Sequence, residues 1–380
     1  AATSAHIWAN SYERTISDIF GVENEVAKEV ASALKVKLAP SEVKRLTTIP
    51  TNNSRAHDLY LQAYALNDRT DEQDQVNAIA LLEEAVKLDS HYAAAWALLA
   101  DSELALGDVY LPPRKVIPKA RRAALEAVSS DYNLAAGHSE LGALEYYYDW
   151  DYSEARTQLE KAVDLDPGSA DARLLLADFL AEHEGDYKSA EKELARARVI
   201  DPLDPWISYY ESITALVAGQ KAMALELARV TLTLDPHFYY DFDPLGHVYA
   251  AMGEYKQCES RYRDVAQYVQ RAAISYEYAA CAIKAGDLKK GHVILERMLS
   301  ASEHSYVDNT YLAAVYTALG EKDRAFLMLK KALTDRSSYL STITQNFWFD
   351  DLKSDGRFAE LLASMKAIAV DESSSHNAKI

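Results

Sequence analysis

Five glycines recur along the second half of the chain at an almost constant interval. Gly185, Gly219, Gly253, Gly286 and Gly320 are separated by 34, 34, 33 and 34 residues. A fixed period of roughly 20 to 50 residues is the signature of an array of repeated units, not of one compact core. Each unit of such an array folds in the same way and buries its apolar face against its neighbours.

A second marker runs in parallel with the glycines. Asp166, Asp201 and Asp235 each follow an apolar residue and precede a proline, and they lie 35 and 34 residues apart. Proline cannot donate the next backbone hydrogen bond of a helix, so each Asp-Pro pair predicts the end of a helix.

The apolar residues between these markers recur with a helical period. Phe242, Leu245, Gly246 and Tyr249 lie at i, i+3, i+4 and i+7, which places them on one face of a helix. The same pattern resumes after the glycine turn, where Cys258 begins the apolar face of a second helix. The sequence therefore predicts two antiparallel helices in each unit and an all-α protein.

Length and composition agree with an elongated array. The chain has 380 residues, more than the roughly 250–300 that a single core holds. Lys and Arg number 40 and Asp and Glu 58, a net charge of −18 that disfavours nucleic acid and anionic lipid surfaces. No run of about 18 apolar residues is present, so we expect no direct insertion into a membrane.

The markers divide the chain into about eight units with different segments at both ends. The predicted units are 55–89, 92–131, 134–166, 169–201, 205–235, 239–268, 272–303 and 306–335. Residues 1–54 form an N-terminal junction with an amphipathic helix over 22–38 and a linker. Residues 336–370 form a C-terminal cap with a helix near 355–369, and residues 371–380 a disordered tail.

This register resembles the tetratricopeptide repeat (TPR). The resemblance rests on residues such as His138, Leu141 and Gly142 in a first helix, followed by Ala155 and Leu159 in a second. It implies a right-handed superhelical solenoid whose concave groove is lined by the first helix of every unit. Such solenoids bind a peptide or a partner protein, so the resemblance implies an interaction scaffold.

The two ends of the chain resemble a wider bacterial group. The segments 6–14 and 348–358 are similar to those of TolB-like/TPR proteins, in which TPRs follow an adenylate or guanylate cyclase, a winged-helix or a kinase domain. This resemblance implies a soluble bacterial segment that docks or regulates in a larger signalling protein. The sequence leaves open whether it is cytoplasmic or periplasmic.

No pattern in the chain predicts catalysis. The ten histidines show no metal-ligand spacing, and no nucleophile elbow or glycine-rich phosphate loop is present. The acidic pairs around Trp150 and before the last helix are typical of helix caps. We therefore expect no enzymatic activity, no metal and no cofactor.

The two cysteines, Cys258 and Cys281, permit one disulfide or none, and two buried free thiols are the favoured interpretation.

The TPR register also predicts which residues face the groove. Positions 2, 5, 9 and 12 of each unit point inward, and the middle of the groove is then aromatic and apolar. The predicted partner-binding residues are Tyr146, Phe179, Trp206, Tyr209, Ile213, Tyr240, Asp243, His247 and Tyr276. Aromatic residues with a polar tip favour peptide binding, and the net charge favours a neutral or basic partner. The groove positions lack the lysines and asparagines with which chaperone-docking TPRs hold a C-terminal carboxylate.

Three alternatives remain at this stage. The aromatic residues could pack between neighbouring helices as core. The module could instead self-associate through the helix at 22–38 or through the aromatic residues Phe347–Phe349. A third alternative is a small-ligand or lipid sensor with a pocket around Tyr146–Tyr152.

Overall fold

The computed structural model describes residues 25–26, 29–30, 50–67, 71–238, 243–267 and 272–377. Eight helix pairs follow one another along these residues. Their bounds are α3 Ser54–Asn67 and α4 Glu72–Leu88; α5 Ala93–Val109 and α6 Pro113–Ser130; α7 Ala135–Leu144 and α8 Tyr152–Leu165; α9 Ala170–Asp178 and α10 Tyr187–Ile200; α11 Pro205–Val217 and α12 Lys221–Leu234; α13 Pro244–Met252 and α14 Tyr255–Val265; α15 Ala272–Lys284 and α16 Leu288–Ala301; α17 Asn309–Ala318 and α18 Lys322–Asp335.

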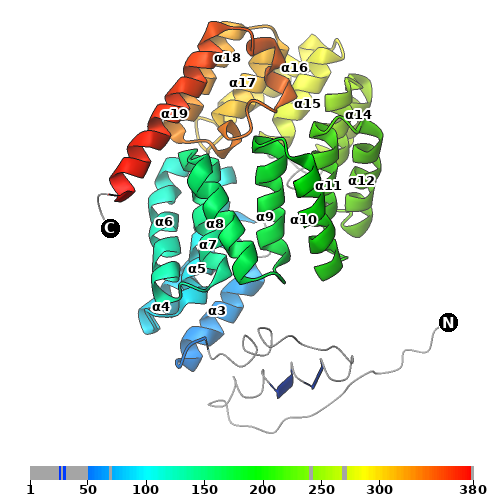
Figure 1. Ribbon diagram of the computed structural model, residues 1–380. Helices are drawn as coiled ribbons and strands as arrows, with labels where there is room; N and C mark the ends of the chain where they lie inside the picture. The colour runs from blue at the N-terminus through cyan, green and yellow to red at the C-terminus, as the bar shows by residue number, and fades with distance from the viewer. Residues whose placement is uncertain are drawn as a thin grey trace, which may run out of the picture.

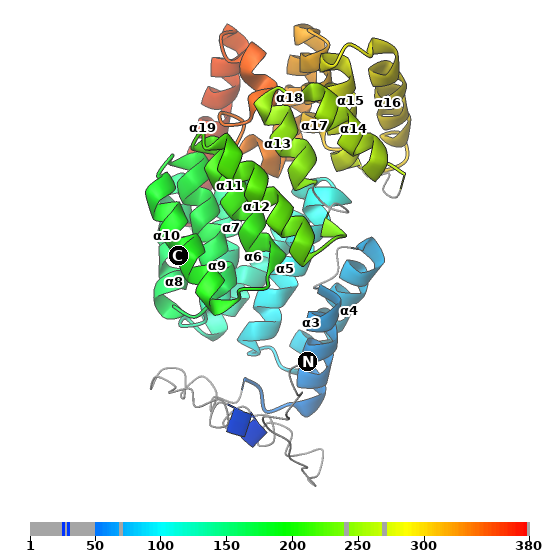
Figure 2. The ribbon, with the colours of Figure 1, turned by 90° about the vertical axis from the view of Figure 1, so that its right-hand side faces the viewer.

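The pairs stack into a curved solenoid, which confirms the predicted fold class. Each odd-numbered helix packs against the next odd-numbered helix, whereas the even-numbered helices of the pairs contact mainly their odd-numbered neighbours. The odd-numbered helices therefore form the more tightly curved side, which we call the inner wall. Figure 1 follows the array from α3 in blue to α18 in orange, and Figure 2 shows α3 and α4 at one end of the molecule and α15–α19 at the other.

The recurring glycines and aspartates have distinct backbone roles. All five glycines of the period have positive φ, between 68° at Gly185 and 100° at Gly286, a region that residues with a side chain rarely adopt. The aspartates end the second helices. In each Asp-Pro turn the side chain accepts a backbone N–H two residues on, at 2.9 Å for Asp166, 3.1 Å for Asp201 and 2.8 Å for Asp235. These turns fix the period because they recur with the same geometry.

Small residues allow the two helices of a pair to approach closely. A Cβ atom added at Gly142 would lie 2.6 Å from Leu159 Cδ2, and one added at Gly246 would lie 2.5 Å from Tyr262 Cε2. Both distances are shorter than van der Waals contact allows. The glycines on the first helices thus make room for the large side chains of the second helices.

Two first helices end differently from the others. α7 and α9 widen into π-helical turns, η2 (Glu145–Asp149) and η3 (Phe179–His183). Trp150 follows η2 with φ of 59°, in the place where later units have glycine. Within the described residues, the other non-glycine residue with positive φ is Arg336, which ends α18 with φ of 60°. Both conformations cost free energy, so contacts elsewhere in the fold must hold them in place.

The ends of the chain differ in part from the prediction. The last helix, α19, spans Gly356–Asn377, so the backbone is helical through much of the tail that the sequence assigns to disorder from residue 371. Of the predicted helix at 22–38, residues 25–26 and 29–30 are helical. Its other residues, and most of the junction 1–54, lie outside the described residues.

We predict that Gly246→Ala destabilises the protein by about 2 kcal/mol, because its added methyl group overlaps the Tyr262 ring. Urea unfolding followed by circular dichroism measures the effect. Gly356→Ala is the matched control, since a Cβ atom there meets nothing within 4 Å. Equal unfolding midpoints for the two variants would contradict close packing at Gly246.

Candidate functional site

The inner wall is the candidate site, and a segment of the chain itself lies against it. After α18, residues 336–349 return across the array; we call them the closing segment. Arg336 Nη1 donates to the backbone oxygen of Tyr148 at 3.2 Å, and its guanidinium lies 5.4 Å from the centre of the Trp150 ring. Tyr152 Oη donates to the backbone oxygen of Ser341 at 3.5 Å. The C-terminal end of the array is thereby joined to the third unit.

The same segment also contacts later units. The ring of Phe347 lies 5.2 Å from that of His247, and the ring of Tyr339 lies 5.0 Å from that of Tyr311. Leu340 and Ile343 are almost fully buried. The closing segment therefore covers part of the groove that the sequence predicts to be open.

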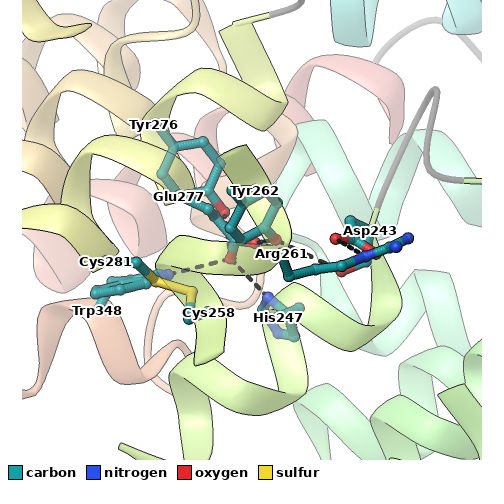
Figure 3. Close-up of a disulfide and its surroundings, with 9 residues drawn as sticks. All are labelled: Asp243, His247, Cys258, Arg261, Tyr262, Tyr276, Glu277, Cys281 and Trp348. Atoms are coloured by element: carbon teal, nitrogen blue, oxygen red, sulfur yellow. Dashed lines mark hydrogen bonds and ion pairs between the residues drawn. A yellow bond between two sulfur atoms is a disulfide. The ribbon is translucent and has the colours of Figure 1, made fainter. Parts of the chain in front are cut away.

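Glu277 on α15 holds the closing segment by direct hydrogen bonds (Figure 3). Its carboxylate accepts from Trp348 Nε1 at 3.2 Å and from Tyr262 Oη, and it lies 2.7 Å from His247 Nδ1. Burial disfavours the protonated form of His247, but the carboxylates of Glu277 and Asp243 outweigh it and raise the His247 pKa above its ordinary value. One buried carboxylate thus joins α13, α14, α15 and the last 3₁₀ turn, η6 (Phe347–Leu352).

A disulfide lies beside this carboxylate. Cys258 on α14 and Cys281 on α15 are bonded, with their Cα atoms 5.9 Å apart (Figure 3). The favoured interpretation of two free thiols is therefore wrong. Sequence spacing places the cysteines on neighbouring helices, but the distance between those helices decides whether the sulfur atoms meet.

The inner wall at the fourth unit is acidic and buried. Asp178 accepts a hydrogen bond from Tyr147 Oη at 2.7 Å, and burial raises its pKa to about 6 despite that bond. Burial and the nearby Asp178 raise the pKa of Glu182 well above its ordinary value, although Thr342 of the closing segment hydrogen-bonds to it. Groups of this kind bind a proton more tightly in the folded protein than in the unfolded chain.

Several predicted groove residues are buried and cannot contact a partner in this structure. Tyr146 and Phe179 are fully buried and pack edge to face at 5.2 Å. Ile213 is buried in α11, and Asp243 is buried and paired with Arg261 at 2.8 Å. For Tyr146 and Phe179 the core alternative describes the structure better, because the two rings are buried against each other.

The other predicted residues have three different placements. Tyr240 lies outside the described residues. His247 and Tyr276 are partly exposed beside the closing segment, and Tyr276 stacks on Tyr311 at 4.6 Å. Trp206 and Tyr209 are partly exposed on α11.

Trp206, Tyr209 and Tyr210 form an aromatic patch with Phe238, which follows α12. Trp206 lies 4.7 Å from Phe238 and 5.7 Å from Tyr209 between ring centres, and Tyr209 lies 5.4 Å from Phe238. We call the three residues on α11 the α11 aromatic surface. Phe238 is buried and packs against the rings of Trp206 and Tyr209.

Comparison with known proteins agrees with this architecture. The family described as tetratricopeptide repeat matches residues 149–209, which cover α8, the whole fourth helix pair and the beginning of α11. Residues 149–209 therefore match the tetratricopeptide repeat, and the helix pairs before and after them have the same architecture. The APC/C hetero-tetramer Cut9–Hcn1 is similar in structure to the TPR array, with a TM-score of 0.53 and 18% identity over 80% of this chain and 58% of that one. A TPR protein from Parabacteroides merdae ATCC 43184 has a TM-score of 0.48 and 11% identity, over 72% of this chain and 99% of that one.

One curated relative matches part of the TPR chain. "Putative adenylate cyclase 3" of Rhizobium meliloti (strain 1021) is 30% identical over 143 residues, which are 37% of this chain and 24% of that protein. The match spans about a quarter of the relative's length. It therefore assigns no activity to the TPR array.

Two features of the inner wall were missed by sequence reasoning. The closing segment has no periodic pattern that indicates where it packs. Glu277 directly follows the predicted groove residue Tyr276, and the sequence analysis did not predict its burial. The aromatic and small residues around it are the signal that could have indicated a buried position. Within the described part of the chain, no group of three His, Cys, Asp or Glu residues could hold a metal ion, and no helix is long and apolar enough to cross a membrane.

We predict that Asp178 makes stability fall with rising pH. Its folded-state pKa of about 6 lies above the ordinary 3.8, so the folded protein retains a proton that the unfolded chain releases. This stabilisation is complete below the ordinary value and is lost as the pH rises through 6. Asp178→Asn removes the titration, so urea midpoints at pH 4.5 and 7 differ less than in the wild type. Asp164→Asn, an exposed change on α8, leaves the wild-type difference; a wild-type slope in Asp178→Asn would contradict the assignment.

We predict that reducing the Cys258–Cys281 disulfide lowers the free energy of unfolding by about 3 kcal/mol, because the sequence separation is 23 residues and the closed loop restricts the unfolded chain. Thermal unfolding with and without dithiothreitol measures the loss. The double variant Cys258→Ala/Cys281→Ala is the control and shows no response to the reductant. A wild-type protein equally stable in both conditions would contradict a stabilising role.

Proposed function

We propose that this chain is a non-enzymatic scaffold that binds a protein or peptide partner on the α11 aromatic surface. Stacked TPR helix pairs form a protein-interaction scaffold, and this fold is present here. The observation that carries the finer proposal is the partial exposure of Trp206, Tyr209 and Tyr210 on one inner helix. Large, rigid aromatic side chains of this kind dominate the binding free energy of many interfaces.

The closing segment supports this location. It contacts the inner wall at the third unit through Trp150 and at the later units through His247 and Glu277. The α11 aromatic surface lies between these contacts along the array. A partner that binds there reaches apolar anchors without displacing the hydrogen bonds of Glu277.

The charge of the chain supports a neutral or basic partner. With a net charge of −18, the protein attracts cations and repels anions over about one Debye length. Association with such a partner therefore weakens as salt is added. The apolar contacts of the aromatic side chains depend little on salt, so their share of the affinity remains when salt is added.

The setting of the scaffold is also a proposal. The resemblance of both chain ends to TolB-like/TPR proteins, and a relative named for adenylate cyclase, support a regulatory or docking role in a larger bacterial signalling protein. The disulfide supports the periplasmic alternative over the cytoplasmic one, because disulfides persist in oxidising compartments.

We predict that Trp206→Ala/Tyr209→Ala weakens partner binding at least about 30-fold, as expected for interface hot spots. Residues 1–380 serve as bait in a lysate of the source cell, and the affinity of a recovered protein is then measured for each variant. Val199→Ala/Leu203→Ala is the matched control, because these apolar side chains are 85% and 74% exposed outside the α11 aromatic surface. Circular dichroism verifies that both variants are folded.

Three outcomes separate the alternatives. Loss of binding in the aromatic variant but not in the control supports the α11 aromatic surface. Equal binding by both variants overturns it. Recovery of only further copies of the same chain favours self-association instead. Of the residues Phe347–Phe349 that the sequence suggests for such a contact, Trp348 and Phe349 are buried and Phe347 is partly exposed.

A further inference from the structure

A cavity of about 580 Å³ lies where the C-terminal cap meets the third and fourth units. Its walls come from distant parts of the chain: the turn at Trp150–Ser153, the end of η3 at His183, the closing segment and α19. The cavity therefore exists only because the array folds back on itself. Its volume falls within the range of small-molecule sites, roughly 300–1,000 Å³.

The wall formed by α19 is an apolar stripe. Leu362, Met365 and Ala369 line the cavity and follow one another at intervals of three and four residues, so they share one helix face. Leu340 and Ile343 of the closing segment add further apolar surface. These side chains suit an extended hydrocarbon body.

The opposite wall is aromatic and is held by strained backbone. Tyr152 stacks on His183 with ring centres 3.5 Å apart, and Trp150 lies beside them under the guanidinium of Arg336. Trp150 and Arg336 are the two non-glycine residues with positive φ in the described chain, and they contact each other. Strain of this kind persists only where surrounding contacts over-determine the geometry, and it concentrates at functional sites.

The charged side chains that line the cavity differ in the interactions that they already make with the protein. Lys366 on α19 lines the cavity and is exposed. Asp151 also lines the cavity, but its carboxylate caps α8 by accepting from the backbone N–H of Glu154 at 3.2 Å. Burial lowers the pKa of His183, so its ring is neutral at pH 7 and adds no charge. Lys366 thus provides a positive charge at the cavity.

We propose that this cavity binds a small amphipathic acid, a long-chain aliphatic carboxylate whose hydrocarbon chain lies between α19 and the Tyr152–His183 stack and whose head group pairs with Lys366. Each methylene group buried from water adds to the affinity, and the ion pair orients the chain. The site is separate from the α11 aromatic surface and does not depend on the proposed partner. It joins the cap to the third unit, so an occupant bridges both.

Dodecanoate, used below its micelle concentration, is the probe that tests this site. Isothermal titration calorimetry on the full 380-residue chain measures its affinity, and the change in total tryptophan fluorescence of the wild type, to which Trp150 in the cavity wall contributes, provides a second signal. Ala369→Trp fills the cavity and is expected to weaken binding at least tenfold. Ala367→Trp is the matched control, because Ala367 is exposed on the same helix and does not line the cavity.

The head group is tested separately. Lys366→Gln is expected to weaken dodecanoate binding about fivefold, as for an exposed ion pair. Lys330→Gln, an exposed change on α18, leaves the affinity unchanged. The cation dodecyltrimethylammonium is expected to bind the wild type less tightly than dodecanoate by a similar factor.

Two results would overturn the proposal. Absence of dodecanoate binding by the folded wild type at millimolar concentration excludes the site, and so does an affinity that Ala369→Trp leaves unchanged. Equal binding of the carboxylate and the ammonium compound overturns the assignment of the acidic head group to Lys366. None of these results affects partner binding at Trp206 and Tyr209, so the two proposals fail independently.

Discussion

Each helix pair of this protein has apolar surface on two sides, and both sides must be covered for the pair to remain folded. Along the array the neighbouring pairs provide that cover, helped by glycines such as Gly246 that let the helices approach. At the C-terminal end of the described residues, α18 is followed by the closing segment and α19 in place of another helix pair. There α19 packs on α18, and the closing segment turns back along the inner wall to η2. The need to cover the last pair thus determines where the end of the chain lies.

This return places polar groups inside the solenoid, where each must find a partner. Glu277 accepts hydrogen bonds from the second helix of the sixth unit and from the closing segment, and Asp178 accepts one from Tyr147. Burial raises the pKa of Asp178 and of Glu182, so these two carboxyl groups keep a proton to a higher pH than carboxyl groups in water do.

The repeat register predicted the fold well and the candidate site only in part. Gly185 and the later glycines mark the turns correctly, because positive φ is a local requirement that the residue type reveals. Periodicity also predicts which positions face inward, and Tyr146 and Phe179 at two of these positions are buried and pack against each other. A helical period predicts the direction in which a side chain points. It does not predict which other side chains lie on that side of the helix. The glycine-free turn at Trp150 was visible in the sequence, but its role depends on Arg336, which is distant along the chain.

The sequence by itself determined the helix pairs, their turns and their order, because these follow from local hydrogen bonding, backbone conformation and apolar spacing. Only the tertiary structure decided that the array closes on its third unit, that Cys258 and Cys281 are bonded, and that a cavity forms against α19. These features join residues far apart in the chain. Whether such residues meet depends on the curvature of the whole array. Small differences in the angle of each helix crossing add up over the units, so no single repeat specifies these contacts.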